Sequence, residues 1–177
     1  MPEMPSPAVR VPGVSEVTVR MAAPADWPAV AGLLVELGRG VAAGTANDPT
    51  HQLQFVGHIR RIDNVTLVAG GDDQDVLGVI DMEYHQRLGD HRPQARVNDL
   101  IVTDRARGRG VGRALLTRAE ELARRRGCFR MALVTAAWRR ETIAFYERQG
   151  WQNYGEWFVK PLTDDVGLGG EPIRDDN

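Results

Sequence analysis

The sequence predicts an α/β fold built on one mixed sheet. Strand-like segments alternate with helix-like segments, two consecutive strand segments join across a short Gly-rich turn as in a hairpin, and others are separated by a helix. A chain of 177 residues, 42% of them hydrophobic, is long enough for one domain with a substantial core. We expect that domain at residues 16–162, between a Pro-rich flexible tail (1–15) and a Gly-rich, acidic flexible tail (163–177).

The first half of the domain reads as a strand, two helices and a hairpin. Residues 17–21 (VTVRM) alternate like a strand, and Asp26 is placed to cap a helix that ends at Gly38. A second helix starts at Asp48-Pro49. Residues 65–69 and 76–84 form the hairpin around a turn at 70–74. The expected buried positions of the two helices are Trp27, Val30, Ala31, Leu34 and Leu37, then Leu53, Val56 and Ile59.

The second half alternates strands with helices. A strand at 96–103 leads into a long helix that reaches residue 126, with apolar residues at 111, 115, 119 and 122 and Gly127 as its end. Residues 130–136 (RMALVTA) are nearly all apolar, which is typical of a central strand covered on both faces. A short helix at 141–149 closes at Gly150, and residues 156–162 form the last expected strand.

Composition excludes several functional classes. A formal net charge of −2 gives no overall attraction to nucleic acid or to an anionic membrane. The single cysteine, Cys128, cannot form an internal disulfide, which favours a cytoplasmic location. We find no signal-peptide pattern and no apolar run long enough to span a bilayer. The four histidines lack the spacing of metal ligands, so we expect no metal.

Residues 99–112 (DLIVTDRARGRGVG) carry most of the functional information. Glycines at 108, 110 and 112 lie where a strand ends and a long helix begins, so that backbone N–H groups without helical partners point outward. Arginines 105, 107, 109 and 113 add positive charge, and a diphosphate is the ligand that suits this junction. A P-loop is excluded because no Lys-Ser/Thr follows, and the spacing differs from G-x-G-x-x-G. A nucleic-acid site and a solvated surface turn remain as alternatives.

Three segments carry a resemblance to a known family. Residues 107–112 (RGRGVG) resemble the R/Q-x-x-G-x-G/A signature of the GNAT superfamily of N-acetyltransferases. Residues 99–102 (DLIV) resemble the strand before that signature, and residues 144–151 (AFYERQGW) resemble the late helix that ends F-Y-x-x-x-G-F. Residues 127–135 followed by 144–151 are most similar to the small-amine branch, which includes aminoalkylphosphonate and glucosamine-6-phosphate N-acetyltransferases, and residues 157–162 resemble the aminoalkylphosphonate group.

The resemblance implies a fold, a cosubstrate and a set of binding residues. The fold is a mostly antiparallel sheet of six to seven strands, splayed at its centre and flanked by about four helices. Acetyl-CoA would lie with its pantetheine arm along 100–102 and its diphosphate on the loop, and Tyr146 would protonate the departing thiolate. The Ile101 N–H would polarise the thioester carbonyl. The implied cofactor-binding residues are Leu100, Ile101, Val102, Arg107, Gly108, Arg109, Gly110, Val111, Gly112, Arg113 and Tyr146.

This sequence departs from the family at the position of the base that must deprotonate the amine. Asn98 stands where relatives often carry Glu, and Arg139 stands where many have Asn. An amide cannot accept the proton, so we expect Glu83 on the preceding strand to act, with Asp81, Asp99 or a water relay as alternatives.

The acceptor is expected to be a small primary amine, such as an amino sugar or an aminoalkylphosphonate. Arg87, His91 and Arg92, in the loop before residue 96, could bind an anionic group of that substrate, although an exposed polar hairpin explains them as well. A protein lysine or N-terminus as acceptor, and a sensor that binds acetyl-CoA without turnover, are the other hypotheses. The family habit and the apolar last strand favour a homodimer.

Overall fold

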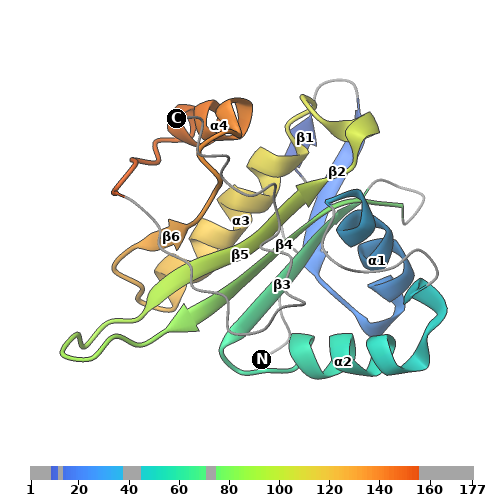
Figure 1. Ribbon diagram of the computed structural model, residues 1–177, viewed down its shortest axis with the longest axis horizontal. Helices are drawn as coiled ribbons and strands as arrows, with labels where there is room; N and C mark the ends of the chain where they lie inside the picture. The colour runs from blue at the N-terminus through green and yellow to red at the C-terminus, as the bar shows by residue number, and fades with distance from the viewer. Residues whose placement is uncertain (1–8, 12–13, 38–44, 71–74, 156–177) are drawn as a thin grey trace, which may run out of the picture.

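The computed structural model describes residues 9–11, 14–37, 45–70 and 75–155, and a mixed sheet runs through its centre (Figure 1). Within these residues the strands lie side by side in chain order, and only the last pair is parallel, so the sheet is mixed, as the sequence predicts. The strands are β1 (Val9–Val11), β2 (Val14–Met21), β3 (Asn64–Gly70), β4 (Val76–His85), β5 (Gln94–Val102) and β6 (Met131–Leu133). Part of the predicted N-terminal tail is therefore a strand, and the strand expected at 156–162 lies outside the described residues.

Helices cover both faces of the sheet, which separates two apolar cores. Figure 1 shows α1 (Trp27–Glu36) and α2 (Pro49–Ile59) on one face, and α3 (Val111–Arg125) packs on the other. The fourth helix, α4 (Arg140–Arg148), packs beside the start of α3 through Phe145. The predicted four helices are confirmed for the described part of the chain, in which no helix has the length and apolar character needed to cross a bilayer.

The starts of α1 and α2 follow the sequence, the predicted end of α1 at Gly38 lies outside the described residues, and one buried residue was predicted wrongly. Asp26 precedes α1 without capping it, since its carboxylate pairs with both Arg20 terminal nitrogens at 2.7 Å. Asp48 does cap α2. Leu53 is 72% exposed, because Phe55 is the α2 side chain that packs on Trp27, with ring centroids 5.4 Å apart.

The long helix α3 follows its predicted pattern closely. Val111, Leu115 and Ala119 are buried against the sheet, and Leu122 is partly buried beside them. Gly127 has a φ of 80°, a left-handed conformation that suits glycine at the end of a helix. This helix therefore has a fixed position on the sheet, which also fixes the loop before it.

The predicted central strand at 130–136 is much shorter in the structure. Only Met131–Leu133 are in β6, and all three residues are partly exposed rather than covered on both faces. β6 pairs with β5 over Ala95–Val97 alone, so the two strands stop sharing hydrogen bonds after Val97. An apolar run does not by itself distinguish a fully covered strand from one that leaves the sheet early.

Gly78 on β4 allows close packing between β4, β5 and α3. A Cβ at this position would lie 2.8 Å from the carbonyl oxygen of Ile101 and 3.1 Å from Cδ1 of Leu115. Both distances are below ordinary van der Waals contact. Any side chain here would therefore push α3 or β5 away from the sheet.

We predict that Gly78→Ala lowers the free energy of unfolding by about 1–3 kcal/mol, because overpacking a rigid site has that cost. Gly57→Ala is the matched control, since Gly57 lies on α2 with no atom within 4 Å of the added Cβ. It should raise stability by about 0.5–1 kcal/mol through helix propensity. Urea unfolding of both variants measures the difference. Equal effects of the two substitutions would contradict the packing account.

Candidate active site

A glycine-containing loop joins β5 to α3. A 3-10 turn (Asp104–Ala106) follows the strand, and the chain then passes through Gly108 and Gly110 before α3 begins. Gly108 has a φ of 72° and Gly110 a φ of 83°, which are left-handed conformations that side chains disfavour. These two turns direct the backbone N–H groups of the loop toward the helix start.

Most of these amides lack a hydrogen-bond partner among the residues that the structure describes. The Arg107 amide donates to the Asp104 carbonyl at 3.3 Å, and the Arg109 amide donates to the Ala106 carbonyl at 3.4 Å. Among the described residues, no hydrogen bond satisfies the amides of Gly108, Gly110, Val111, Gly112 and Arg113. The predicted set of outward amides at 107–112 is therefore correct for the glycines and for Val111, whereas Arg107 and Arg109 bond within the turn.

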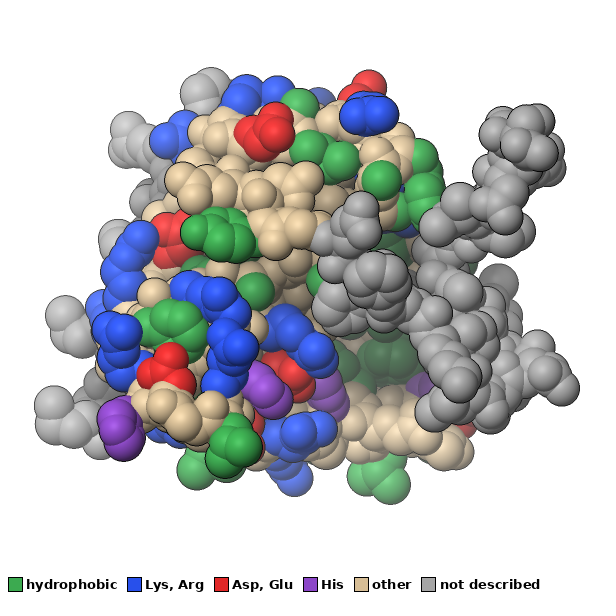
Figure 2. Space-filling view, turned by 60° about the vertical axis from the view of Figure 1, so that its left-hand side comes forward, with side chains coloured by type: hydrophobic (Ala, Val, Ile, Leu, Met, Phe, Trp, Pro, Cys, Tyr) green, Lys and Arg blue, Asp and Glu red, His purple; other side chains and the backbone are tan. Residues whose placement is uncertain are grey.

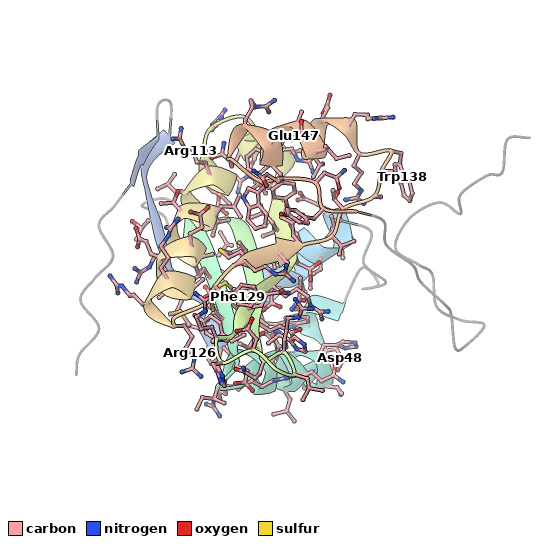
Figure 3. The ribbon with its side chains drawn as sticks, turned by 90° about the vertical axis from the view of Figure 1, so that its left-hand side faces the viewer. Asp48, Arg113, Arg126, Phe129, Trp138 and Glu147 are labelled. Carbon is pink, nitrogen blue, oxygen red and sulfur yellow. The ribbon has the colours of Figure 1, made fainter. Side chains whose placement is uncertain are left out.

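The four arginines of the loop fall into two classes. Arg105 forms an ion pair with Asp75, and Arg107 pairs with Asp104 at 2.7 Å while its Nε donates to the Val102 carbonyl at 3.2 Å. Within the described chain, Arg109 and Arg113 have no ion pair. Figure 3 labels Arg113 at the end of α3 that begins beside this loop. Arg109 and Arg113 are therefore the arginines available to an anion.

The edge of β5 opens just before this loop. Thr103 N–H donates to the Leu77 carbonyl of β4 at 2.9 Å, and the carbonyl of Ile101 also faces β4, at Gly78. Backbone groups alternate along a strand, so those of Leu100 and Val102 face the opposite side. Since β6 ends its pairing at Val97, the Leu100 N–H and C=O and the Val102 N–H have no hydrogen-bond partner in the described residues.

The prediction that the Ile101 N–H faces the thioester is therefore wrong. In register, Ile101 pairs with Val79 of β4, and its side chain is buried under α1 and α2. A bulge where the β4–β5 register shifts, at Asn98, changes which residues face outward. The amide that can meet a carbonyl oxygen on the open edge is that of Leu100.

Tyr146 lies on α4 near the same end of the molecule. Its ring packs in the apolar cluster that includes Leu100 and Val102, 5.7 Å from the Trp151 ring. In Figure 3, Glu147 of α4 and Arg113 lie at one end of the molecule. Burial raises the pKa of Tyr146 to about 12, against a smaller opposing effect of the Arg139 charge. The phenol therefore keeps its proton at neutral pH and can donate it in a hydrogen bond.

On the face covered by α1 and α2, Asp81 of β4 holds a polar network. Its Oδ1 accepts hydrogen bonds from Thr66 Oγ1 at 2.7 Å, His58 Nε2 at 2.8 Å and Asn64 Nδ2 at 3.0 Å. Its Oδ2 accepts from Asn98 Nδ2 at 3.1 Å. Burial pushes the pKa of Asp81 upward, but the bonds from Asn64, Thr66 and His58 outweigh it and hold that pKa below its ordinary value.

Sequence reasoning missed this network, although one signal was present. Asn64 and Thr66 are buried polar residues in a strand of otherwise apolar character. Such residues require hydrogen-bond partners, which points to a partner on the next strand. Thr66 does pair in register with Asp81. The contribution of His58 could not be read from the sequence, because it comes from a different element.

Glu83, the predicted base, lies two residues further along β4 on the same face as Asp81. Its Oε1 pairs with Arg96 Nη2 on β5 at 2.8 Å. The structure thus places Glu83 opposite the part of β5 that still pairs with β6, before the open edge begins, and one of its oxygens is engaged by a guanidinium. Asp99 pairs in register with Asp81 and also has an interaction partner.

The proposed anion anchors of the acceptor lie at the other end of the sheet. Arg87, His91 and Arg92 belong to the loop of the β4–β5 hairpin, beyond Gln94. Six residues of strand separate Gln94 from Leu100, or about 20 Å at the usual rise per residue. A small amine cannot reach across that length, so this loop and the open edge do not form one small-molecule pocket.

Basic and aromatic side chains cluster around that distant end. Arg92 and Arg130 stack on the Phe129 ring at 5.5 and 5.1 Å, and Arg126 stacks on Tyr84 at 5.4 Å. Figure 2 shows Lys and Arg side chains gathered on this side of the molecule, and Figure 3 places Arg126 and Phe129 away from Arg113. Their aromatic partners account for these arginines structurally.

Taken together, the described residues offer three kinds of chemical group along β5. Unpaired amides and two free arginines can bind a diphosphate, the open strand edge can hydrogen-bond an extended amide-containing chain, and a protonated phenol stands near both. The described part of the chain contains no group of three or more His, Cys, Asp or Glu side chains arranged to hold a metal ion.

Comparison with known proteins agrees with this geometry. The model of the Acetyltransferase (GNAT) family matches residues 34–151. The fold is similar to that of a transcriptional regulator from Bacillus halodurans C-125, at 25% identity and a TM-score of 0.75 over 82% of this chain and 99% of that chain. An acetyltransferase from Trypanosoma brucei matches at 20% identity and a TM-score of 0.71, over 82% of this chain and 99% of that chain. Glucosamine-6-phosphate N-acetyltransferase from Arabidopsis thaliana matches at 18% identity and a TM-score of 0.69, over 83% of this chain and 99% of that chain.

We predict that Asp81→Asn lowers the free energy of unfolding by about 2 kcal/mol at pH 7, because hydrogen bonds to a charged group contribute about 1.5–3 kcal/mol. The folded-state pKa of Asp81 lies below its ordinary value of 3.8, so the carboxylate stabilises the protein above that pH. The difference between wild type and variant should shrink as the pH falls below 3.8 and the carboxylate takes up its proton.

The control is Glu83→Gln, which removes a partner of the exposed Arg96. It should cost less than about 1 kcal/mol, as is usual for solvent-exposed ion pairs. Unfolding free energies of both variants between pH 3 and 7 test the prediction. A constant deficit of Asp81→Asn over that range would show that the charge of Asp81 is not what stabilises the fold.

Proposed function

The chain belongs to the acetyltransferase (GNAT) family, and on that premise we propose that it transfers the acetyl group of acetyl-CoA to a primary amine of a small molecule. Family membership makes the protein an acyltransferase and implies acetyl-CoA as the acetyl donor. The family does not specify the acceptor. The amine, its size and the residues that bind it belong to the proposal.

The observation that carries the proposal is the combination of unpaired amides and an open strand edge. The amides of Gly108, Gly110 and residues 111–113 can donate to the diphosphate of acetyl-CoA, and the partial positive charge of the α3 N-terminus supports this. Arg109 and Arg113 add full charges. The pantetheine arm contains amide groups that can bond to Leu100 and Val102 as an added strand would.

The same residues support direct attack of the amine on the thioester. The carbonyl oxygen gains negative charge during attack, and the Leu100 N–H is a fixed donor for it. The C–S bond then breaks, and the leaving sulfur needs a hydrogen-bond donor or a proton. Tyr146 can serve because its phenol is protonated and its ring packs on that of Phe145, which lies beside Gly112.

A small acceptor is favoured over a protein acceptor by the fold comparison with glucosamine-6-phosphate N-acetyltransferase, which acts on an amino sugar phosphate. Amino sugars and aminoalkylphosphonates remain the first candidates. The homodimer stays a prediction. A thiol-release assay with acetyl-CoA and a panel of amino sugars, aminoalkylphosphonates, polyamines and a lysine peptide tests the proposal. Thiol release with the small amines is expected, and release with the lysine peptide alone would overturn it.

We predict that Tyr146→Phe lowers kcat by about tenfold or more, the scale of lost general-acid assistance. The control is Tyr154→Phe, which makes the same chemical change at a side chain that is 89% exposed, and it should leave kcat unchanged. Because the pKa of Tyr146 is about 12, wild-type kcat should not fall through ionisation of this phenol below about pH 11. Equal rates for wild type and Tyr146→Phe would remove Tyr146 from the mechanism.

We predict that Arg109→Ala together with Arg113→Ala raises the Kd for acetyl-CoA about tenfold, equivalent to about 1.4 kcal/mol of lost charge-assisted hydrogen bonding. Arg105→Ala is the matched control on the same loop, since Arg105 is already paired with Asp75. Its Kd should stay close to that of wild type. Calorimetric titration distinguishes the variants, and an equal loss of affinity in the control would show that only overall charge matters.

A further inference from the structure

Four hydrogen bonds fix the carboxylate of Asp81 on the face under α1 and α2. Its donors come from three different elements besides β4: His58 from α2, Asn64 and Thr66 from β3, and Asn98 from β5. The Asp81 side chain is only 13% exposed. Side-chain packing alone does not require four hydrogen-bond donors around one nearly buried carboxylate. These donors keep Asp81 ionised and already engaged as a hydrogen-bond acceptor.

Asp81 is therefore a poor direct base for an amine. Three donors share its Oδ1 and a fourth engages Oδ2, so most of the acceptor capacity of this carboxylate is already used by protein donors. The bonds that hold its pKa below the ordinary value also lower its affinity for a proton. Asn98, which stands where relatives often have Glu, is itself one of these donors and cannot take a proton.

His58 has the opposite character. Its Nε2 lies 2.8 Å from Asp81 Oδ1, and its side chain is 41% exposed. Because Asp81 is ionised, Nε2 carries the hydrogen of that bond, and in the neutral ring Nδ1 keeps a lone pair. Within the described residues, Nδ1 has no hydrogen-bond partner. An imidazole oriented by a carboxylate, with its second nitrogen free, is an arrangement suited to accepting a proton.

The sheet register puts Asp81, the partner of this imidazole, one strand away from the open edge of β5. Asp81 pairs with Asp99, and the neighbouring pair is Ile80 with Leu100, whose N–H faces the open edge. One step along a strand and one across give a separation of about 6 Å between the Cα atoms of Asp81 and Leu100. The acceptor nitrogen must approach this edge, whereas His58 lies on the β3 side of Asp81 with Asn98 on the other side, so a proton from the nitrogen reaches His58 through water on the face under α1 and α2.

We propose that His58, held by Asp81, is the base that deprotonates the acceptor amine. The inference rests on the acetyltransferase function proposed above. Through this water, His58 Nδ1 takes one proton from the ammonium group and passes it to solvent. The neutral nitrogen then forms the C–N bond as the C–S bond breaks with its electron pair on sulfur. The nitrogen loses a second proton, which balances the one gained by the thiolate, and the amide keeps the third.

The other charged groups on this face do not replace His58. On β4 and β5 they are Asp99, which pairs in register with Asp81 and is engaged by another interaction, and Glu83 and Arg96, which pair with each other at 2.8 Å. β3 contributes only the neutral Asn64 and Thr66 to the network. On α2 itself, His51 pairs with Asp48 at the start of the helix and stacks on Trp27. His51 is thus a histidine of the same helix, held by an aspartate, but remote from Asp81.

The test compares His58→Gln with His51→Gln in the full-length protein, using the best small amine of the panel. Glutamine at 58 can still donate to Asp81 but cannot accept the proton at neutral pH. We expect kcat/KM at pH 7 to fall about 100-fold for His58→Gln and to lose the wild-type dependence on pH. His51→Gln should keep the wild-type rate and profile. The Kd for acetyl-CoA and the melting temperature should be unchanged in both variants.

Chemical rescue separates a proton acceptor from a structural residue. Added imidazole should restore part of the activity of His58→Ala and none of the activity of Tyr146→Phe. If wild type is active and His58→Gln keeps the wild-type pH profile, the role of His58 is overturned and the acetyltransferase proposal stands. The same holds if Glu83→Gln is the one variant that loses that profile. Absence of thiol release by wild type from every amine would overturn both.

Discussion

The unpaired amides at the start of α3 are the feature on which the site depends. A helix start leaves N–H groups without partners, and a protein normally satisfies them with a capping side chain. Here the residue at the cap is Gly110, which has no side chain to offer, and a left-handed turn at Gly108 precedes it. The local sequence therefore keeps these donors open for an external anion, and the buried apolar face of α3 keeps them in place on the sheet.

The second constraint is the point at which β5 and β6 separate. Their pairing ends at Val97 and Leu133, and the strand continues to Val102 with one edge open. A bulge at Asn98 shifts the alternation, so that Ala95 and Val97 face β6 but Leu100 and Val102 face outward. The same bulge directs the Asn98 side chain to Asp81. One local irregularity thus sets both the edge that can receive a thioester and the polar network on the other face.

How well the sequence predicted each part follows from the range of the interactions involved. The glycine loop and the pattern of α3 depend on neighbours in the chain, and both were predicted. The strand register was not predictable in this way, because a shift of one residue turns every backbone N–H and C=O to the opposite edge of the strand. The N–H predicted to meet the thioester was therefore that of Ile101 instead of Leu100. His58 and Asp81 are 23 residues apart and meet only through tertiary packing. Leu53 and Phe55 are similarly apolar, and only contact with Trp27 decides between them.

Amide hydrogen exchange with and without acetyl-CoA tests the central claim most directly, because it reports on the backbone groups themselves. If the cosubstrate binds as described, the amides of Gly108, Gly110, Gly112, Leu100 and Val102 should gain protection, while those at the distant β4–β5 hairpin should not. Protection confined to other regions, with these amides exchanging as fast as in the free protein, would contradict the account.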